Sequence, residues 1–207
     1  MASDWLDLVP ELAMFPLGSP LFPHMPLRLQ VFEPRYLQML AELIEAKKVR
    51  FGVVLIERGH EVGGGEQRFD VGTVAEVSDL DAQDGLVQLE AHGGSRFRVR
   101  DWLADAPYPR AEVVELPELE WAADQQPLRD QAEQLVRRTL AKASEFADHL
   151  WPSDIELSDD PVAAAWQLAA IAPLTALDQH KLLGAASMVE LLSDTLELTG
   201  EAAAGFG

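Results

Sequence analysis

The sequence predicts an α+β fold in which a β-rich unit is followed by a small helical unit. Up to about residue 118, short apolar runs either alternate with polar residues or are interrupted by proline, which is typical of short strands. From about Pro127 onward, apolar residues recur at three- and four-residue spacing, as on one face of a helix. The 207 residues, 48% of them hydrophobic, are enough to bury a sizeable core.

The first elements lie in a proline-rich stretch, "FPLGSPLFPHMPLRLQVFEPRY". Proline lacks a backbone donor, so we expect residues 12–17 and 26–32 to form short or edge strands. Pro34 suits the first position of a helix, because its missing N–H would have no partner there. The spacing of apolar residues after it predicts a helix over residues 34–48.

The remaining β-rich runs follow in order, and with the first two they predict six or seven short strands in a barrel or sandwich. "RFGVVLIER" indicates a buried strand, "EVGGGEQ" a loop, and "FDVGTVAEVSDLD" a further strand in which Gly72 marks a bulge or a close approach. Asp84–Gly85 is a hairpin signal. "LVQLEAH", "SRFRVRDWL" and "RAEVVEL" then alternate as three further strands.

The helical unit begins with one long amphipathic segment. Asp160 before Pro161 is a favourable N-cap for the next helix. Thr175 with Asp178 predicts a capping box, and the last helix is expected to end at Gly200.

These elements divide the chain into two domains with short tails. We expect a β-rich domain over residues 10–118 and a helical domain over 119–200. Residues 1–9 and 201–207 are expected to be tails.

The composition limits the classes of function. The 16 Lys and Arg residues against 35 Asp and Glu residues give a net charge of −19, which disfavours a nucleic-acid partner. The absence of cysteine excludes disulfides and thiolate metal sites. No apolar run approaches the roughly 20 residues of a membrane span, and the N-terminus lacks a basic leader. We therefore expect a cytoplasmic protein of bacterial type without a membrane partner.

Motifs of catalysis and metal binding are missing. Gly63–Gly65 precede Glu66 and Gln67, whereas a phosphate-binding loop needs Lys and Ser or Thr. Ser95 is not in a nucleophile elbow, and the five histidines are scattered along the chain. We therefore expect no enzyme activity, no catalytic residues, no metal site and no cofactor.

The motifs nevertheless carry a family resemblance. The opening "FPLGSPLFPHMPLRLQVFEPRYLQML", then "FGVVLI", "VGTVAEV", "GGSRFRV" and "LTALDQHKLLGAASMVELL", occur in the order seen in the N-terminal (substrate-binding) domain of Lon protease. Over about residues 10 to 200 the chain resembles that family, and "FEPRY" looks most like its free-standing single-domain members. The residues that carry the two clearest motifs are Glu33, Pro34, Arg35, Tyr36, Gly94, Arg96, Phe97 and Arg98.

The resemblance implies a PUA-like pseudo-barrel followed by a helical bundle. It also implies a non-catalytic module that binds unfolded or misfolded polypeptides, with a role as an adaptor in proteolysis or quality control. A protease or a chaperone would then be a further partner.

The candidate contact residues for a polypeptide lie in the proline-rich connection and in a neighbouring loop. Methionine and apolar side chains offer adaptable surface to unfolded chains. The candidates are Leu21, Phe22, Met25, Pro26, Gly63, Gly64 and Gly65. The alternative for Phe22 and Met25 is that they only close one end of the barrel.

RNA binding is an alternative function of a different class, and fewer observations in the sequence support it. Arg96, Arg98 and Arg100 alternate along one strand and would form a basic strip, with Lys47, Lys48 and Arg50 in a second basic cluster. The arginines could instead pair with acids.

One such pair can be stated as an expectation. We expect Glu33 to pair with Arg35, Arg96 or Arg98 and so to tie the start of the first helix to the barrel.

Overall fold

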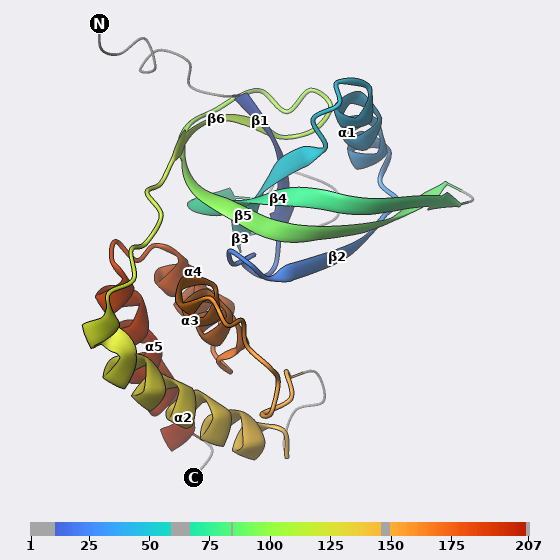
Figure 1. The fold of residues 1–207 in the computed structure, drawn as a ribbon. Coiled ribbons are helices and arrows are strands. Elements are labelled where there is room, and N and C mark those ends of the chain that lie inside the picture. The colour runs from blue at the N-terminus through green and yellow to red at the C-terminus, as the bar shows by residue number, and fades with distance from the viewer. Residues whose placement is uncertain (1–10, 59–66, 84, 146–149, 206–207) are drawn as a thin grey trace, which may run out of the picture. The chain divides into compact units, whose positions relative to one another are not determined.

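The computed structural model describes residues 11–58, 67–83, 85–145 and 150–205. They form two compact units, which are described one at a time. The β unit comprises Pro26–Pro117 with the chain up to Leu21, and the helical unit comprises Phe22–Met25 with the chain from Glu118 onward. Figure 1 shows the strands of the first unit and the helices of the second.

A six-stranded sheet forms the body of the β unit. Its strands are β1 (Glu11–Leu17), β2 (Pro26–Val31), β3 (Arg50–Arg58), β4 (Gln67–Gln83), β5 (Leu86–Trp102) and β6 (Arg110–Glu115). The order is β2-β5-β4-β3-β1-β6, and β6 also pairs with β5. Five strands therefore close into a barrel, and β2 extends the sheet from β5 outside that ring (Figure 1). The predicted α+β fold with a pseudo-barrel is confirmed.

The long strand β5 joins the barrel to its extension. Its first half pairs with β2, from Val87 to His92, and its second half pairs with β6, from Phe97 to Trp102. The sequence predicted two separate strands here, "LVQLEAH" and "SRFRVRDWL", and that prediction was wrong. The glycines between them do not end the strand, because a shift in its register with β4 accommodates the extra residues.

The barrel interior is apolar and is filled at its centre by Phe97. The buried cluster consists of Leu12, Met14, Val54, Phe97, Val99, Ala111 and Val113. Two glycines make room for the ring: a Cβ on Gly52 would lie 2.8 Å from Phe97 Cζ, and one on Gly72 would lie 2.6 Å from it. Real Cβ contacts are longer than this, so the ring of Phe97 fits only because both positions lack a side chain. The close approach predicted at Gly72 is confirmed.

Helix α1 (Pro34–Glu45) packs on the outside of the barrel. Tyr36 stacks on Phe15 of β1, with ring centroids 4.0 Å apart, and Phe15 in turn contacts Phe51 of β3. Pro34 occupies the first turn as predicted. The helix ends before the expected residue 48, because Lys47 adopts a left-handed conformation, with φ of 55°.

Four α-helices build the helical unit: α2 (Gln126–Ala143), α3 (Pro161–Ile171), α4 (Ala176–Leu183) and α5 (Met188–Ala204), with a short 3-10 turn at Ala123–Gln125. The predicted caps are confirmed: Asp160 accepts from the N–H of Ala163, and Thr175 from the N–H of Asp178. The predicted end of the last helix at Gly200 was wrong. The following Glu and Ala residues favour helix, and their preference outweighs the cost of about 1 kcal/mol for an interior glycine.

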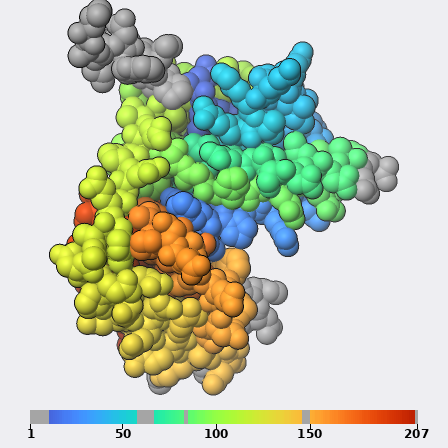
Figure 2. All heavy atoms as spheres, viewed as in Figure 1, coloured from blue at the N-terminus to red at the C-terminus, as the bar shows by residue number. Residues whose placement is uncertain are grey.

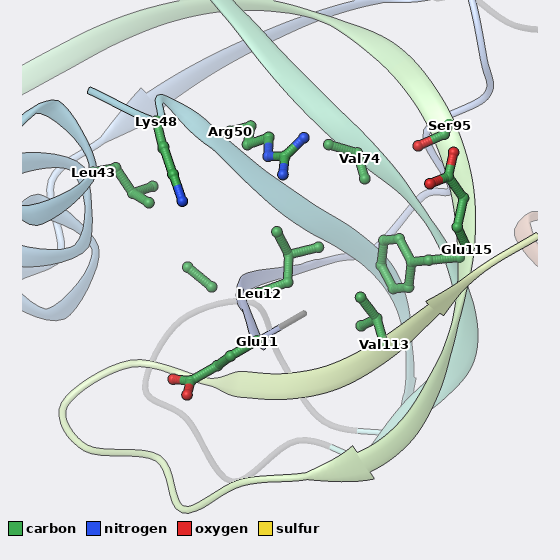
Figure 3. Close-up of a pocket in the computed structure, with 11 residues that line it drawn as sticks. Glu11, Leu12, Leu43, Lys48, Arg50, Val74, Ser95, Val113 and Glu115 are labelled. Carbon is green, nitrogen blue, oxygen red and sulfur yellow. The ribbon is translucent and has the colours of Figure 1, made fainter. Parts of the chain in front are cut away.

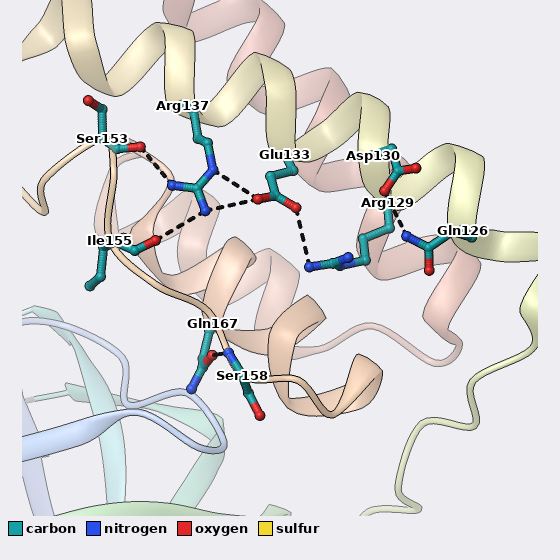
Figure 4. A network of polar contacts seen from close by, with 9 residues as sticks. All are labelled: Gln126, Arg129, Asp130, Glu133, Arg137, Ser153, Ile155, Ser158 and Gln167. Carbon is teal, nitrogen blue, oxygen red and sulfur yellow. Dashed lines mark hydrogen bonds and ion pairs between the residues drawn. The ribbon is translucent and has the colours of Figure 1, made fainter.

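A network centred on Arg137 holds the segment between α2 and α3. Its guanidinium donates to the carbonyls of Ser153 and Ile155 and pairs with Glu133 one turn earlier on α2 (Figure 4). In the space-filling view the side chains of α2 and of this segment form adjoining parts of one face of the helical unit (Figure 2). None of the described helices is both long and apolar enough to cross a lipid bilayer.

Candidate functional site

A pocket opens at the end of the barrel where β1 and β3 begin and β6 ends; we call it the barrel pocket. It measures about 290 Å³. Its lining consists of Glu11, Leu12, Ala13, Leu43, Lys48, Arg50, Val74, Ser95, Phe97, Val113 and Glu115. The strands supply most of these residues, and Leu43 comes from α1. The pocket is thus the open end of the barrel, partly bordered by a helix.

The floor of the barrel pocket is apolar and its rim is charged. Lys48, in the turn before β3, and Arg50, the first residue of β3, extend over it, whereas Ser95 and Glu115 lie on its opposite side (Figure 3). Glu11 forms an ion pair with Arg110 at 2.8 Å. The side chains of Lys48 and Arg50 make no ion pair or hydrogen bond with any other residue that the structure describes. Glu115 likewise has no ion-pair partner among the described residues, so beside its apolar floor the pocket has two unpaired cations and one unpaired acid.

The turn between α1 and β3 presents these cations. Lys47 has φ of 55°, and the N–H of Lys48 returns to the carbonyl of Leu43 to close the helix end. A non-glycine residue in this conformation is strained, and such strain is concentrated at functional sites.

Across the described residues, no group of three or more His, Asp or Glu side chains is arranged to hold a metal ion.

The polypeptide-contact residues named from the sequence are mostly not on the surface. Leu21, Phe22 and Met25 are buried, and only Pro26 is exposed. The ring of Phe22 contacts that of Trp166 in α3, so Phe22 packs within the helical unit. Gly63, Gly64 and Gly65 lie outside the described residues.

The residues of the first family motif organise the start of α1. Glu33 pairs with Arg35 at 3.2 Å, which confirms the expected ion pair with one of its three named partners. This contact spans only two residues along the chain, so by itself it does not tie the helix to the barrel. The ring of Tyr36 instead makes that connection, and Arg35 lies over its face at 4.5 Å.

The second motif serves the barrel. Phe97 fills its interior, whereas buried Arg96 donates to the carbonyl of Pro117 at 2.9 Å, where the chain leaves the β unit. Burial lowers the pKa of the Arg96 guanidinium. Gly94 lies beside the flexible side chain of Glu76.

The basic strip predicted from Arg96, Arg98 and Arg100 does not form as one exposed surface. Arg96 is buried, Arg98 pairs with Asp70 at 2.8 Å, and Arg100 pairs with Glu112 at 3.0 Å. The prediction counted alternation along a single strand. It missed the neighbouring strands, which bring acids beside two of the arginines.

Sequence reasoning did not identify the barrel pocket. It noted Lys47, Lys48 and Arg50 as a basic cluster, but the other lining residues, such as Val113 and Glu115, carry no local signal of a site. Val113 and Glu115 reach the pocket because β6 pairs with β5 and also with β1, and the pairing with β1 spans about a hundred residues of sequence.

Comparisons with known proteins bear on the identity of this fold. Residues 11–200 match the family described as the ATP-dependent protease La (LON) substrate-binding domain. The Lon protease of Magnetococcus marinus is 32% identical over 113 residues, which are 52% of this chain and 14% of that protein. The chain thus corresponds to a small part of this curated relative.

Solved structures agree with that assignment. The crystal structure of a Lon N-terminal domain protein from Xanthomonas campestris is 25% identical with a TM-score of 0.64, covering 91% of this chain and 98% of its own. The N-terminal domain of the Mycobacterium avium complex Lon protease is 17% identical and shares the fold, with a TM-score of 0.64 and coverage of 93% and 99%. The resemblance inferred from the sequence motifs is confirmed: this chain belongs to the LON substrate-binding domain family.

Proposed function

We propose that this chain is a non-catalytic recognition module that binds exposed segments of unfolded or misfolded polypeptides. The observation that carries the proposal is the match of residues 11–200 to a family described as the substrate-binding domain of an ATP-dependent protease. The substrates of a protease are polypeptides. A domain that binds them without cleaving them needs adaptable contact surface and no catalytic residues.

Two features of the β unit support polypeptide binding. The barrel pocket combines an apolar floor with a charged rim, as ligand sites commonly do. Strand β2 is the end strand of the sheet, and end strands can accept an extended peptide through main-chain hydrogen bonds. Phe32, directly after β2, is 56% exposed and offers an apolar contact nearby.

The proposed contact surface differs from the one favoured by the sequence. Leu21, Phe22 and Met25 are buried, so within that segment the proposal keeps only Pro26 as a contact. We place the main contact in the barrel pocket. The Gly63–Gly65 loop remains a candidate from the sequence alone.

The test compares how the chain binds one client protein in its unfolded and in its native state. A model protein that is kept unfolded by reduction and carboxymethylation should bind to the chain, and its native form should not. Binding is measured by fluorescence anisotropy, and the same incubation is followed by mass spectrometry for peptide cleavage. Equal binding of both states would refute recognition of unfolded segments, and cleavage of the client would refute a non-catalytic role.

The adaptor role requires a second, separate experiment. We propose that the module works beside a protease or a chaperone in the cytoplasm. Affinity capture from native cytosol should then recover one such protein in stoichiometric amount, and purified components should reconstitute the complex. Failure of the reconstitution would remove the adaptor role and leave polypeptide binding untouched.

RNA binding is supported less well than polypeptide binding. It would rest on Arg98 and Arg100, and carboxylates are hydrogen-bonded to both side chains. The net charge of −19 further opposes a phosphate backbone. Tight binding of single-stranded RNA at low salt would nevertheless reverse this ranking.

A further inference from the structure

We propose that the barrel pocket binds the C-terminal end of a polypeptide. The terminal carboxylate would lie between Lys48 and Arg50, and the last apolar side chain would rest on the floor formed by Phe97. The proposal deepens the function given above and depends on it, because it names which part of a polypeptide the module recognises.

The apolar half of the recognition comes from the barrel interior. Leu12, Val74, Phe97 and Val113 converge on the pocket from β1, β4, β5 and β6. Leu43 of α1 adds an apolar wall. An aliphatic side chain placed here would leave water for an apolar surface already formed by the fold, which favours binding by roughly 25 cal/mol for each Å² removed from water.

The charged half comes from the rim. Lys48 and Arg50 have no ionic partner among the described residues, although the chain as a whole carries a net charge of −19. Among the side chains without an ionic partner at this rim, the two cations outnumber the one acid, Glu115, so the rim favours an anion. Glu115 and Ser95, on the other side, provide acceptors for the backbone N–H groups of the bound chain.

The dimensions favour a chain end over a strand that passes through. A volume of about 290 Å³ lies at the lower end of the range for ligand pockets and has room for one or two residues. Phe97 lines the pocket and also belongs to the buried cluster that fills the barrel, so the pocket does not continue through the barrel. A bound segment must therefore enter and stop, and a C-terminus unites an apolar side chain with a carboxylate in a single residue.

The experiment uses two peptides that differ only at their last group. Both have an uncharged Gly-Ser body that ends in Ala-Leu-Leu and carry a fluorescent label at the N-terminus. One ends in the free carboxylate and the other in the amide. We expect the full chain to bind the acid at least ten times more tightly than the amide, against the overall repulsion between an anion and this acidic protein.

Variants locate the effect in the pocket. Lys48→Gln with Arg50→Gln should lower the affinity for the acid to that for the amide and leave the amide unchanged. The matched control is Arg138→Gln with Lys142→Gln, two exposed bases of α2, which alters the net charge equally and should preserve the preference. All four side chains are exposed, so circular dichroism should show folded protein for both variants.

The outcomes separate this inference from the general function. Equal affinity for acid and amide, or a preference that survives in the Lys48 and Arg50 variant, overturns the inference. Binding of an unfolded client under the same conditions would still support the general function, and its absence would remove both. Hexanoate serves as a competitor: displacement of the peptide by hexanoate at equal concentration would assign the pocket to small carboxylates and overturn binding of polypeptide ends.

Discussion

The hydroxyl of Tyr108 donates a 2.6 Å hydrogen bond to the carboxylate of Glu42, and so joins the loop between β5 and β6 to helix α1. Tyr108 is buried, whereas Glu42 is exposed. Burial, and then the hydrogen bond to Glu42, raise the pKa of Tyr108 to about 12. The same hydrogen bond, with a second from Gln38, lowers the pKa of Glu42. The contact adds a polar link to the aromatic packing of α1 on the barrel.

This contact predicts how stability depends on alkaline pH. Because the pKa of Tyr108 is higher in the folded protein than the value of about 10 in an unfolded chain, its contribution is complete below about pH 10. It should be lost as the pH rises from there through about 12. Urea unfolding at pH 8, 10 and 11 should show a smaller loss of stability for Tyr108→Phe than for the wild type. Parallel losses in the two proteins would contradict the prediction.

The tight packing at Gly72 predicts an unequal pair of glycine substitutions. A Cβ at Gly72 would collide with the backbone carbonyl of Val53 and the ring of Phe97, so Gly72→Ala should cost about 1–3 kcal/mol of folding free energy. At Gly94 the nearest atom is Glu76 Oε1 at 3.0 Å, on an exposed and flexible side chain. Gly94→Ala should therefore stay within about 0.5 kcal/mol. Chemical denaturation measures both, and similar costs would show that the barrel centre is less constrained than described.

Substitution of two arginines of β5, Arg96 and Arg98, should also cost unequal amounts of folding free energy. Arg96→Ala removes a buried side chain together with its part-buried hydrogen bond to the carbonyl of Pro117, and should cost about 1–3 kcal/mol. Arg98→Ala removes an ion pair with Asp70 in which both side chains are about half exposed, and should cost about 0–1 kcal/mol. Thermal unfolding of the two variants is the measurement. A larger effect from Arg98 would refute the structural role given to Arg96.

The network of Arg137 predicts that the segment after α2 depends on one side chain. Arg137→Ala removes the donors to Ser153 and Ile155 and should cost about 1–3 kcal/mol. Arg137→Lys should restore little, because an ammonium lacks the planar fork that reaches two carbonyls and Glu133 together. Arg138→Ala, the exposed neighbour, is the control. Hydrogen exchange should increase in residues 151–158 for the first two variants only, and an unchanged rate there would contradict the assignment.

Local signals in the sequence were reliable where the structure they describe is also local. Pro34, Asp160 and Thr175 act through the backbone of the next few residues, so their helix starts could be predicted without knowledge of the fold. The end of the last helix was misjudged because Gly200 is permitted inside a helix when good helix formers follow it. The continuity of β5 depends on partners far away in sequence, so no local pattern showed it.

The site was harder to predict for the same reason. Phe22 and Met25 were chosen as contacts because they are apolar residues in a proline-rich connection, a signal that cannot distinguish exposed from buried positions. Lys48 and Arg50 were visible only as part of a basic cluster with Lys47. Their meaning depends on the apolar floor beneath them, which four different strands supply.

The ring of Phe97 is at once the centre of the barrel core and the floor of the barrel pocket. The depth of the pocket and the stability of the fold are therefore set by a single side chain. A smaller residue at position 97 would let the pocket bind a longer ligand. The same change would remove core packing and lower the free energy of unfolding by about 3–5 kcal/mol. Selection for larger ligands must then be compensated elsewhere in the barrel. Gly72 cannot supply the lost volume, because a Cβ there would still collide with the backbone carbonyl of Val53.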